Sequence, residues 1–195
     1  MAEGSSLKHI ERWFRKETEN FTLDADAFTL LYETTHLIVF RYVYGLSRGP
    51  AQDAEDLTAE TFARAWRTSH RFYGDKHAAL GWLLSIARNL AIDLARRRKV
   101  RNLEENTSIE LLPDSNLVPE ENVITREKIE VLWRMLDALS DDVREILVLR
   151  YMLGWKVKQV AQYLGMTDNN VSVKIRRALK SLHSEWLRLQ ENDNE

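Results

Sequence analysis

Apolar side chains recur at helical spacing along most of this 195-residue chain, and no segment alternates between apolar and polar residues as a half-buried strand would. The chain contains seven glycines and three prolines, which are too few for the many turns of a sandwich or barrel. Its length suffices for one large domain or two small ones, each with its own core. The sequence therefore predicts an all-α fold.

Three helices are expected in the first half of the chain, over about 25–45, 53–68 and 82–101. Gly45 and the pair Gly49-Pro50 end the first, and the carboxylate of Asp53 suits the start of the second. The apolar residues at helical spacing, expected to face the core, are Phe28, Leu31, Tyr32, Val39, Phe40, Val43, Leu57, Phe62, Ala65, Trp66, Leu83, Ile86, Leu90 and Leu94.

The periodicity fades over residues 102–121, which carry two prolines and a run of acids, so a flexible linker is predicted there. Four further helices should follow, the last of them capped by Thr167. The expected layout is two small helical domains joined by the linker, the second containing a helix-turn-helix. The segments are an extension (1–24), a first domain (25–101), the linker, a second domain (122–189) and an acidic tail (190–195).

Charge is segregated along the chain although the net charge is only -2. Residues 61–100 carry a net charge of +7 and residues 146–188 carry +6, whereas 1–60 and 101–145 carry -5 and -7. Two basic blocks separated by an acidic one suit two contact surfaces for a polyanion. Five cations also stand among the six residues of RRRKVR (96–101); a nuclear address is the alternative explanation, but a helix end suits one poorly.

Several classes of protein are disfavoured by what the sequence contains. Cysteine is absent, so disulfides and thiolate metal sites are excluded and a reducing compartment fits. The acidic N-terminal stretch is unlike a signal peptide, and no apolar run approaches the roughly 20 residues that span a bilayer. For His70, Asp75 and His77 a solvated loop is favoured over a metal site, and no phosphate loop or nucleophile motif occurs. We therefore expect a cytoplasmic protein that is not an enzyme and needs no cofactor.

A helix-turn-helix is predicted in VKQVAQYLGMTDNNVSVKIRRALKSL (157–182). Ala161 lets the second helix cross closely, and Gly165 supplies the left-handed turn residue. Asn and Arg side chains can read base edges in the major groove, and Lys and Arg can neutralise phosphates. The expected anchors are Val171, Ile175 and Leu179, and the outward residues are Thr167, Asp168, Asn169, Asn170, Ser172, Lys174, Arg176, Arg177 and Lys180.

Aromatic and cationic side chains alternate in the loop before the third helix, which suits single-stranded nucleic acid. Bases can stack on the rings while phosphates meet the charges, and each stacked base contributes about 1–3 kcal/mol. The alternative is that Phe72 and Trp82 close the core, and Trp82 remains open between the two roles. The residues concerned are Arg71, Phe72, Tyr73, Lys76 and Trp82.

Four motifs, in order, resemble bacterial RNA polymerase sigma factors of the extracytoplasmic-function group of the sigma-70 family. They are DAEDLTAETFARAWR (53–67), FYGD (72–75), WLLSIARNLAIDLARRRK (82–99), and the pair LSDDVREILVLRY (139–151) and VAQYLGMTDNNVSVKIRRALKSL (160–182). The resemblance covers roughly residues 25–185. It implies a subunit that binds core RNA polymerase, at the beta-prime clamp helices and the beta flap, and recognises the -10 and -35 promoter elements. It also allows for an anti-sigma factor as a partner.

The resemblance assigns three sets of residues. Core polymerase would be bound by Asp53, Glu55, Asp56, Leu57, Glu60 and Phe62. Single-stranded DNA at -10 would be held by Arg71, Phe72, Tyr73, Asp75, Lys76, Trp82, Arg88, Asn89, Arg96, Arg97, Arg98 and Lys99. The duplex at -35 would be read by the outward residues of the helix-turn-helix given above.

This chain departs from the family pattern at a few positions. Ala59 stands where glutamine is frequent, which puts one polymerase contact in question. Asn169-Asn170 replaces a common Gly-Thr or similar pair and indicates an idiosyncratic -35 sequence. Leu179 replaces a frequent arginine. The first rival hypothesis is a dimeric helix-turn-helix repressor or activator; the second is a helical adaptor whose basic blocks meet acidic proteins.

Overall fold

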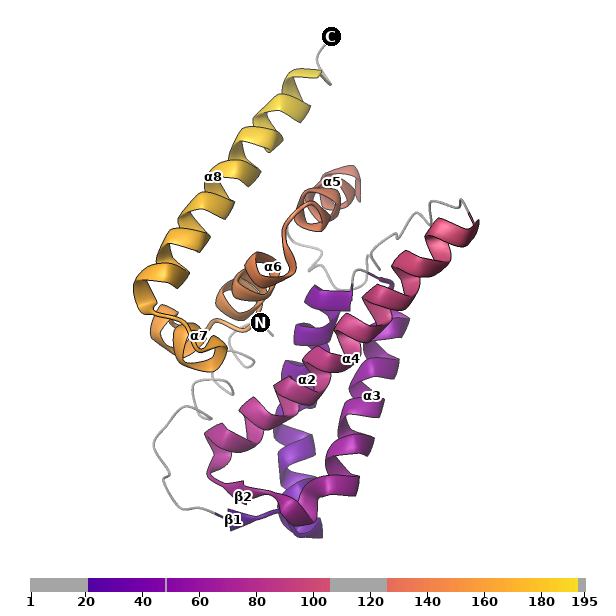
Figure 1. The fold of residues 1–195 in the computed structure, drawn as a ribbon, viewed down its shortest axis with the longest axis vertical. Coiled ribbons are helices and arrows are strands. Elements are labelled where there is room, and N and C mark those ends of the chain that lie inside the picture. The colour runs from indigo at the N-terminus through magenta and orange to yellow at the C-terminus, as the bar shows by residue number, and fades with distance from the viewer. Residues whose placement is uncertain (1–20, 48, 106–125, 193–195) are drawn as a thin grey trace.

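The computed structural model describes residues 21–47, 49–105 and 126–192, and its helices confirm the all-α class (Figure 1). The one strand pair in this part of the chain is two residues long on each side and antiparallel, with Phe21 opposite Gly74. The elements are β1 (Phe21–Thr22), α2 (Ala25–Ser47), α3 (Ala51–Thr68), the 3-10 turn η1 (Ser69–Arg71), β2 (Tyr73–Gly74), α4 (Lys76–Glu105), α5 (Arg126–Asp137), α6 (Asp141–Leu147), the π-helical turn η3 (Val148–Met152), α7 (Val157–Leu164) and α8 (Asp168–Asn192).

Helix α4 is longer than predicted at both ends. It begins six residues before Trp82, because Asp75 accepts a hydrogen bond from the Ala78 N–H at 2.8 Å and caps the helix there. It ends at Glu105, so the first residues of the predicted linker are helical. Residues 106–121 of that linker, residues 1–20 of the predicted extension and residues 193–195 of the tail lie outside the described residues.

The N-terminal unit is the three-helix arrangement of α2, α3 and α4, which lie alongside one another (Figure 1). Its centre is filled by apolar side chains at helical spacing, as predicted; fully buried examples are Val39, Val43, Ala54, Leu83 and Leu84. Two residues predicted to face the core do not: Tyr32 is 47% exposed and Trp66 is 50% exposed. Both lie at the edge of the apolar stripe of their helix, where spacing alone does not separate core from surface.

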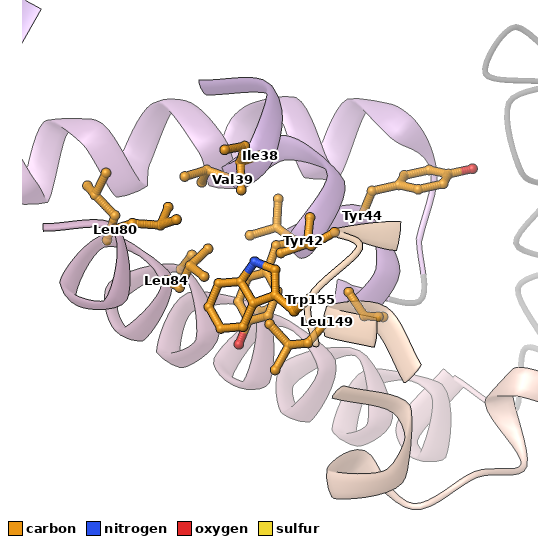
Figure 2. Packing of buried hydrophobic residues seen from close by; sticks show 14 of the residues in the cluster. Ile38, Val39, Tyr42, Tyr44, Leu80, Leu84, Leu149 and Trp155 are labelled. Atoms are coloured by element: carbon orange, nitrogen blue, oxygen red, sulfur yellow. The ribbon is translucent and has the colours of Figure 1, made fainter. Parts of the chain in front are cut away.

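The C-terminal unit consists of α5 to α8, with α8 extending beyond α7 (Figure 1). Its buried side chains include Ile146, Leu149, Leu153 and Val160. They form one continuous cluster with the core of the N-terminal unit, so the two predicted domains pack against each other. Figure 2 shows Leu149 and Trp155 in the same buried cluster as Tyr42 and Leu84.

One helix segment, Lys76–Arg98 of α4, is long and apolar enough to cross a membrane by length and composition alone. Sequence inspection expected no such segment. Its apolar residues Leu80, Leu83 and Leu84 are buried in the cluster shared with α2 and α3. The same hydropathy is therefore accounted for by its place as the central helix of this bundle.

Candidate nucleic-acid interface

The loop between α3 and α4 is fixed by contacts that join it to three other elements. Strand β2 pairs with β1, which ties Tyr73 to Thr22 just before α2. Gly74 allows the loop to pass close to α4, because a Cβ atom there would lie 3.0 Å from the Ala78 Cβ and 3.1 Å from the Phe72 Cζ. The aromatic side chains of this loop are thus presented from a defined backbone.

An open cleft of about 760 Å³ lies between this loop, the end of α3 and the first turns of α4. It brings together five of the residues predicted to hold single-stranded DNA. It also contains residues that were assigned elsewhere or not singled out. The lining residues are Glu60, Arg64, Arg67, Thr68, Arg71, Phe72, Tyr73, Trp82, Ile86 and Asn89.

The aromatic rings in the cleft differ in what they leave free. Phe72 and Trp82 pack together, with ring centroids 5.2 Å apart, and both are half-buried against the core. Trp82 therefore closes the core and lines the cleft at once, which answers the question left open by its sequence. Tyr73 is 71% exposed and presents the most accessible ring surface of the three. It is the best placed to stack on a base.

A carboxylate and two guanidinium groups form an ion cluster at the rim of the cleft. The Arg64 Nε donates to Glu60 at 2.6 Å, and the Arg67 Nη2 lies 3.5 Å from the same oxygen. The hydrogen bond from Arg64 holds the pKa of Glu60 below its usual value. Glu60 thus lies on the cleft rather than with Glu55 and Asp56. Its i, i+4 and i+7 spacing to the two arginines was the signal that could have shown this.

The cations predicted along α4 lie outside the cleft. Asn89 and Arg96 are exposed and seven residues apart, so they share one face of the helix, and Arg97 is exposed beside them. Arg88 is turned to the C-terminal unit, where its Nε donates to both oxygens of Glu145, at 2.8 and 3.0 Å. The backbone of residue 99 is helical, but its side chain lies outside the described residues; of the loop pair, Asp75 caps α4, and Lys76 is the first residue of that helix.

A second candidate surface runs along α3. Glu55 and Asp56 are exposed there, and Ala59, Ala63 and Trp66 continue the same side of the helix. Phe28 packs edge-on against Trp66, with ring centroids 5.0 Å apart. The surface therefore combines carboxylates at one end with an exposed aromatic ring at the other.

The remaining residues assigned to polymerase are placed less openly. Leu57 and Phe62 are buried in the core and support the helix from below. Asp53 forms an ion pair with Arg98, and Gly49 makes room for it, because a Cβ at that position would fall on the Arg98 and Asp53 side chains. Arg98 also donates to the Ser47 carbonyl at 3.4 Å, so this pair ties the end of α2 to α3 and α4.

The helix-turn-helix forms as predicted. Gly165 has φ 65°, the left-handed conformation that favours glycine, and Ala161 is buried where α8 crosses. The Thr167 hydroxyl oxygen accepts from the Asn170 N–H at 3.2 Å and caps α8. Most of the predicted outward residues are exposed; they are Thr167, Asp168, Asn169, Asn170, Arg176, Arg177 and Lys180, with Ser172 and Lys174 partly so.

One predicted anchor of α8 is wrong. Leu179 is 43% exposed, and Ala178 is buried in its place. Val171, Ile175 and Ala178 follow the i, i+4, i+7 spacing of one helix face, and Leu179 lies beside that face. The cation Lys174 is also engaged: its Nζ lies 2.5 Å from Asp142 of α6, and this hydrogen bond holds the pKa of Asp142 below its usual value.

Among the described residues no group of three or more His, Cys, Asp or Glu side chains could hold a metal ion.

Two sequence profiles match the chain and divide it between the two units. The profile described as Sigma-70 region 2 matches residues 31–101, and the one described as Sigma-70, region 4 matches residues 129–182.

Several curated proteins are similar over most of their length. The ECF RNA polymerase sigma factor SigX of Bacillus subtilis (strain 168) is 30% identical over 176 residues, which cover 87% of this chain and 90% of SigX. SigL of Mycobacterium tuberculosis (strain H37Rv), also named an ECF sigma factor, is 30% identical over 161 residues, covering 83% of this chain and 88% of SigL.

Two solved structures share the fold. The sigma factor RpoE of Bartonella quintana, in complex with the anti-sigma factor NepR, superposes with a TM-score of 0.61 at 21% identity, over 80% of this chain and 94% of RpoE. CnrH, in complex with the cytosolic domain of CnrY, gives 0.58 at 20% identity, over 93% of this chain and 97% of CnrH.

Proposed function

This chain belongs to the extracytoplasmic-function group of sigma-70 RNA polymerase sigma factors, and we propose how its surfaces divide the work of that family. It binds core RNA polymerase and directs promoter-specific initiation by recognising -10 and -35 elements. Sigma factors are generally regulators of transcription without enzymatic activity of their own. We further propose that it acts in the cytoplasm, where polymerase and promoter DNA are.

The contact with core polymerase is assigned to the exposed side of α3. Glu55 and Asp56 can pair with cations of the partner, and Trp66 supplies an amphipathic ring of the kind enriched at protein interfaces. Ala59, where the family often has glutamine, leaves a flat surface between them. The buried Leu57 and Phe62 position this side of the helix and do not touch the partner.

The capture of single-stranded DNA at -10 is assigned to the cleft. Tyr73 offers its ring to an unstacked base, and Asn89 can donate and accept hydrogen bonds at a base edge. Arg64, Arg67 and Arg71 surround the opening and attract the phosphates, while Glu60 holds the first two in place. Extracting a base costs unstacking energy, which these contacts would offset.

The reading of the -35 duplex is assigned to α8. Its first turn carries Asn169 and Asn170, both exposed, at the end of a recognition helix that enters the major groove first. Arg176, Arg177 and Lys180 follow on the exposed side and suit base edges and phosphates. By analogy with RpoE, whose structure contains NepR, we include an anti-sigma factor as a further proposed partner.

One observation favours this function over its rivals: the region 2 match coincides with a cleft of aromatic and cationic side chains, and the region 4 match with the helix-turn-helix. A stand-alone repressor has no use for the first, and an acidic-protein adaptor has no use for either. The deciding experiment is transcription with purified core polymerase on a library of promoter fragments, followed by mapping of start sites. Defined starts that require the chain are expected; their absence on all templates would reject the function.

Replacing Arg176 with alanine should weaken binding to the -35 duplex by about 1–3 kcal/mol, provided the guanidinium reads a base edge. The loss should be concentrated at one base pair, because the other contacts of α8 persist. Competition between duplexes that differ at single positions measures both effects. Arg188→Ala is the matched control, since that exposed arginine pairs with Glu185 near the far end of α8. Equal weakening on every sequence would make Arg176 a phosphate contact instead.

A further inference from the structure

A buried carboxylate joins the two units. Glu145 of α6 is 2% exposed, and it accepts a hydrogen bond from the Tyr42 hydroxyl of α2 at 2.5 Å. It also pairs with Arg88 of α4 at 2.8 Å. The Tyr163 hydroxyl of α7 lies 3.5 Å from that of Tyr42. Burial among these groups raises the pKa of Tyr42 well above its usual value.

The backbone of α2 is clasped at the same place. Arg144, the neighbour of Glu145, donates to the Gly45 carbonyl at 3.2 Å. Gly45 is needed for the approach of η3, because a Cβ atom there would lie 2.5 Å from the Val148 Cγ2 and 2.9 Å from the Met152 Sδ. Tyr44 packs edge-on against Trp133 of α5, with ring centroids 5.2 Å apart. Polar and apolar contacts therefore close the two units together.

This closed arrangement holds two predicted DNA contacts close to each other. Arg88, assigned to -10, pairs with Glu145, and Lys174, assigned to -35, pairs with Asp142. The two carboxylates are three residues apart on α6 and therefore adjacent on its surface, so the two cations lie within roughly 15 Å. The elements that they are assigned to are about 25 base pairs apart, or about 85 Å along B-DNA at 3.4 Å per base pair.

We propose that the Glu145 junction is an autoinhibitory latch: it keeps the two units closed in the free chain, and they must separate before both promoter elements can be bound. The inference rests on the proposed function. The latch engages Arg88 and Lys174 with carboxylates of the chain itself, so these cations cannot meet phosphate at the same time. The 20 residues between Glu105 and Arg126 could span at most ~66–72 Å when extended, which permits such separation.

The latch is built so that opening remains accessible. Taking the Glu145 and Arg88 charges from water costs free energy that their pairing only partly returns, so a buried ion pair contributes less to stability than an apolar contact of similar size. When the units part, both charged groups regain water. A partner that offers new contacts to the exposed surfaces can therefore shift the population toward the open form.

The test uses a wedge at Gly45. Gly45→Ala places a methyl group against Val148 but improves the helix propensity of α2, so it should open the junction without unfolding the N-terminal unit. Because the chain lacks cysteine, Ala63→Cys on α3 and Gln162→Cys on α7 allow spin labels at two exposed sites. We expect the label distance in the free full-length chain to lengthen, and unlabelled Gly45→Ala to bind core polymerase about tenfold more tightly.

Two further variants control for unrelated effects. Val148→Ala removes the methyl groups that the wedge meets, so the double variant should return both the distance and the affinity toward those of the original chain. Glu145→Gln keeps the size of the side chain and removes its charge, so it should shift both measurements in the same direction as the wedge. A longer distance with unchanged polymerase affinity would overturn the inhibitory role, and an unchanged distance in both single variants would overturn the latch.

Failure of the latch and failure of the proposed function give different results. The label distances are measured in the free chain and need no polymerase. If no version of the chain supports promoter-specific transcription, the proposed function fails while the distances still report whether the junction opens. If transcription occurs at the same level and affinity in all variants, the function stands and the latch is rejected.

Discussion

The double variant Glu55→Arg/Asp56→Arg is expected to lose core polymerase almost completely, with an affinity lowered by about 1,000-fold, or ~4 kcal/mol. Both carboxylates are exposed on α3, so reversing them removes two attractions and places two cations before the cations of the partner. Truncating one member of a desolvated charge pair already costs about 2–5 kcal/mol. Co-purification with core polymerase measures the loss, and promoter-specific transcription should disappear with it.

The control for this prediction must separate the surface from the fold. Glu185→Arg makes the same chemical change on α8, where the carboxylate forms only an exposed pair with Arg188. Substituting Leu57 would not serve, because that side chain is buried and its loss would leave a cavity in the core. Retention of polymerase by the α3 variant, with an unchanged thermal transition, would move the interface to another side of the molecule.

Local patterns let the sequence predict the helix-turn-helix and the loop. Gly165, Thr167 and Val171 lie within seven residues, and each acts through its own backbone or its own helix face. Periodicity alone, however, does not locate the edge of a face. It placed Leu179, Tyr32 and Trp66 in the core, although all three are about half exposed, because adjacent positions of a helix differ by only about 100°.

Contacts between distant segments could not be read from the sequence. Tyr42 and Glu145 are 103 residues apart, and neither has a local signature that names the other. Glu145 belongs to an acidic segment that was expected to avoid a polyanion, yet it is buried and binds Arg88 of the first basic block. The cleft has the same origin: Glu60 and Arg64 enter it only because α3 ends where the loop of Tyr73 turns back toward α4.

The double variant Tyr73→Ala/Asn89→Ala is expected to reduce stable open-complex formation by about 100-fold, which is ~2.7 kcal/mol. Loss of a stacked base costs about 1–3 kcal/mol, and an unmade hydrogen bond about 0.5–1.5 kcal/mol. Tyr73 is 71% exposed and Asn89 is exposed, so neither change should disturb the core. Permanganate reactivity of unpaired thymines, measured with the holoenzyme, reports the open complex. Tyr73→Phe keeps the ring and should behave nearly as the original chain.

A template that is already unpaired at -10 tells what the cleft contributes. If Tyr73 and Asn89 bind an extracted base, the holoenzyme carrying both substitutions should also bind this template weakly, since the contacts are missing whether or not melting has been done for it. If the two side chains act only while the duplex opens, the pre-melted template should restore full binding. The exposed ring of Tyr73 beside the packed pair of Phe72 and Trp82 favours the first result, because a free aromatic face is what a captured base requires.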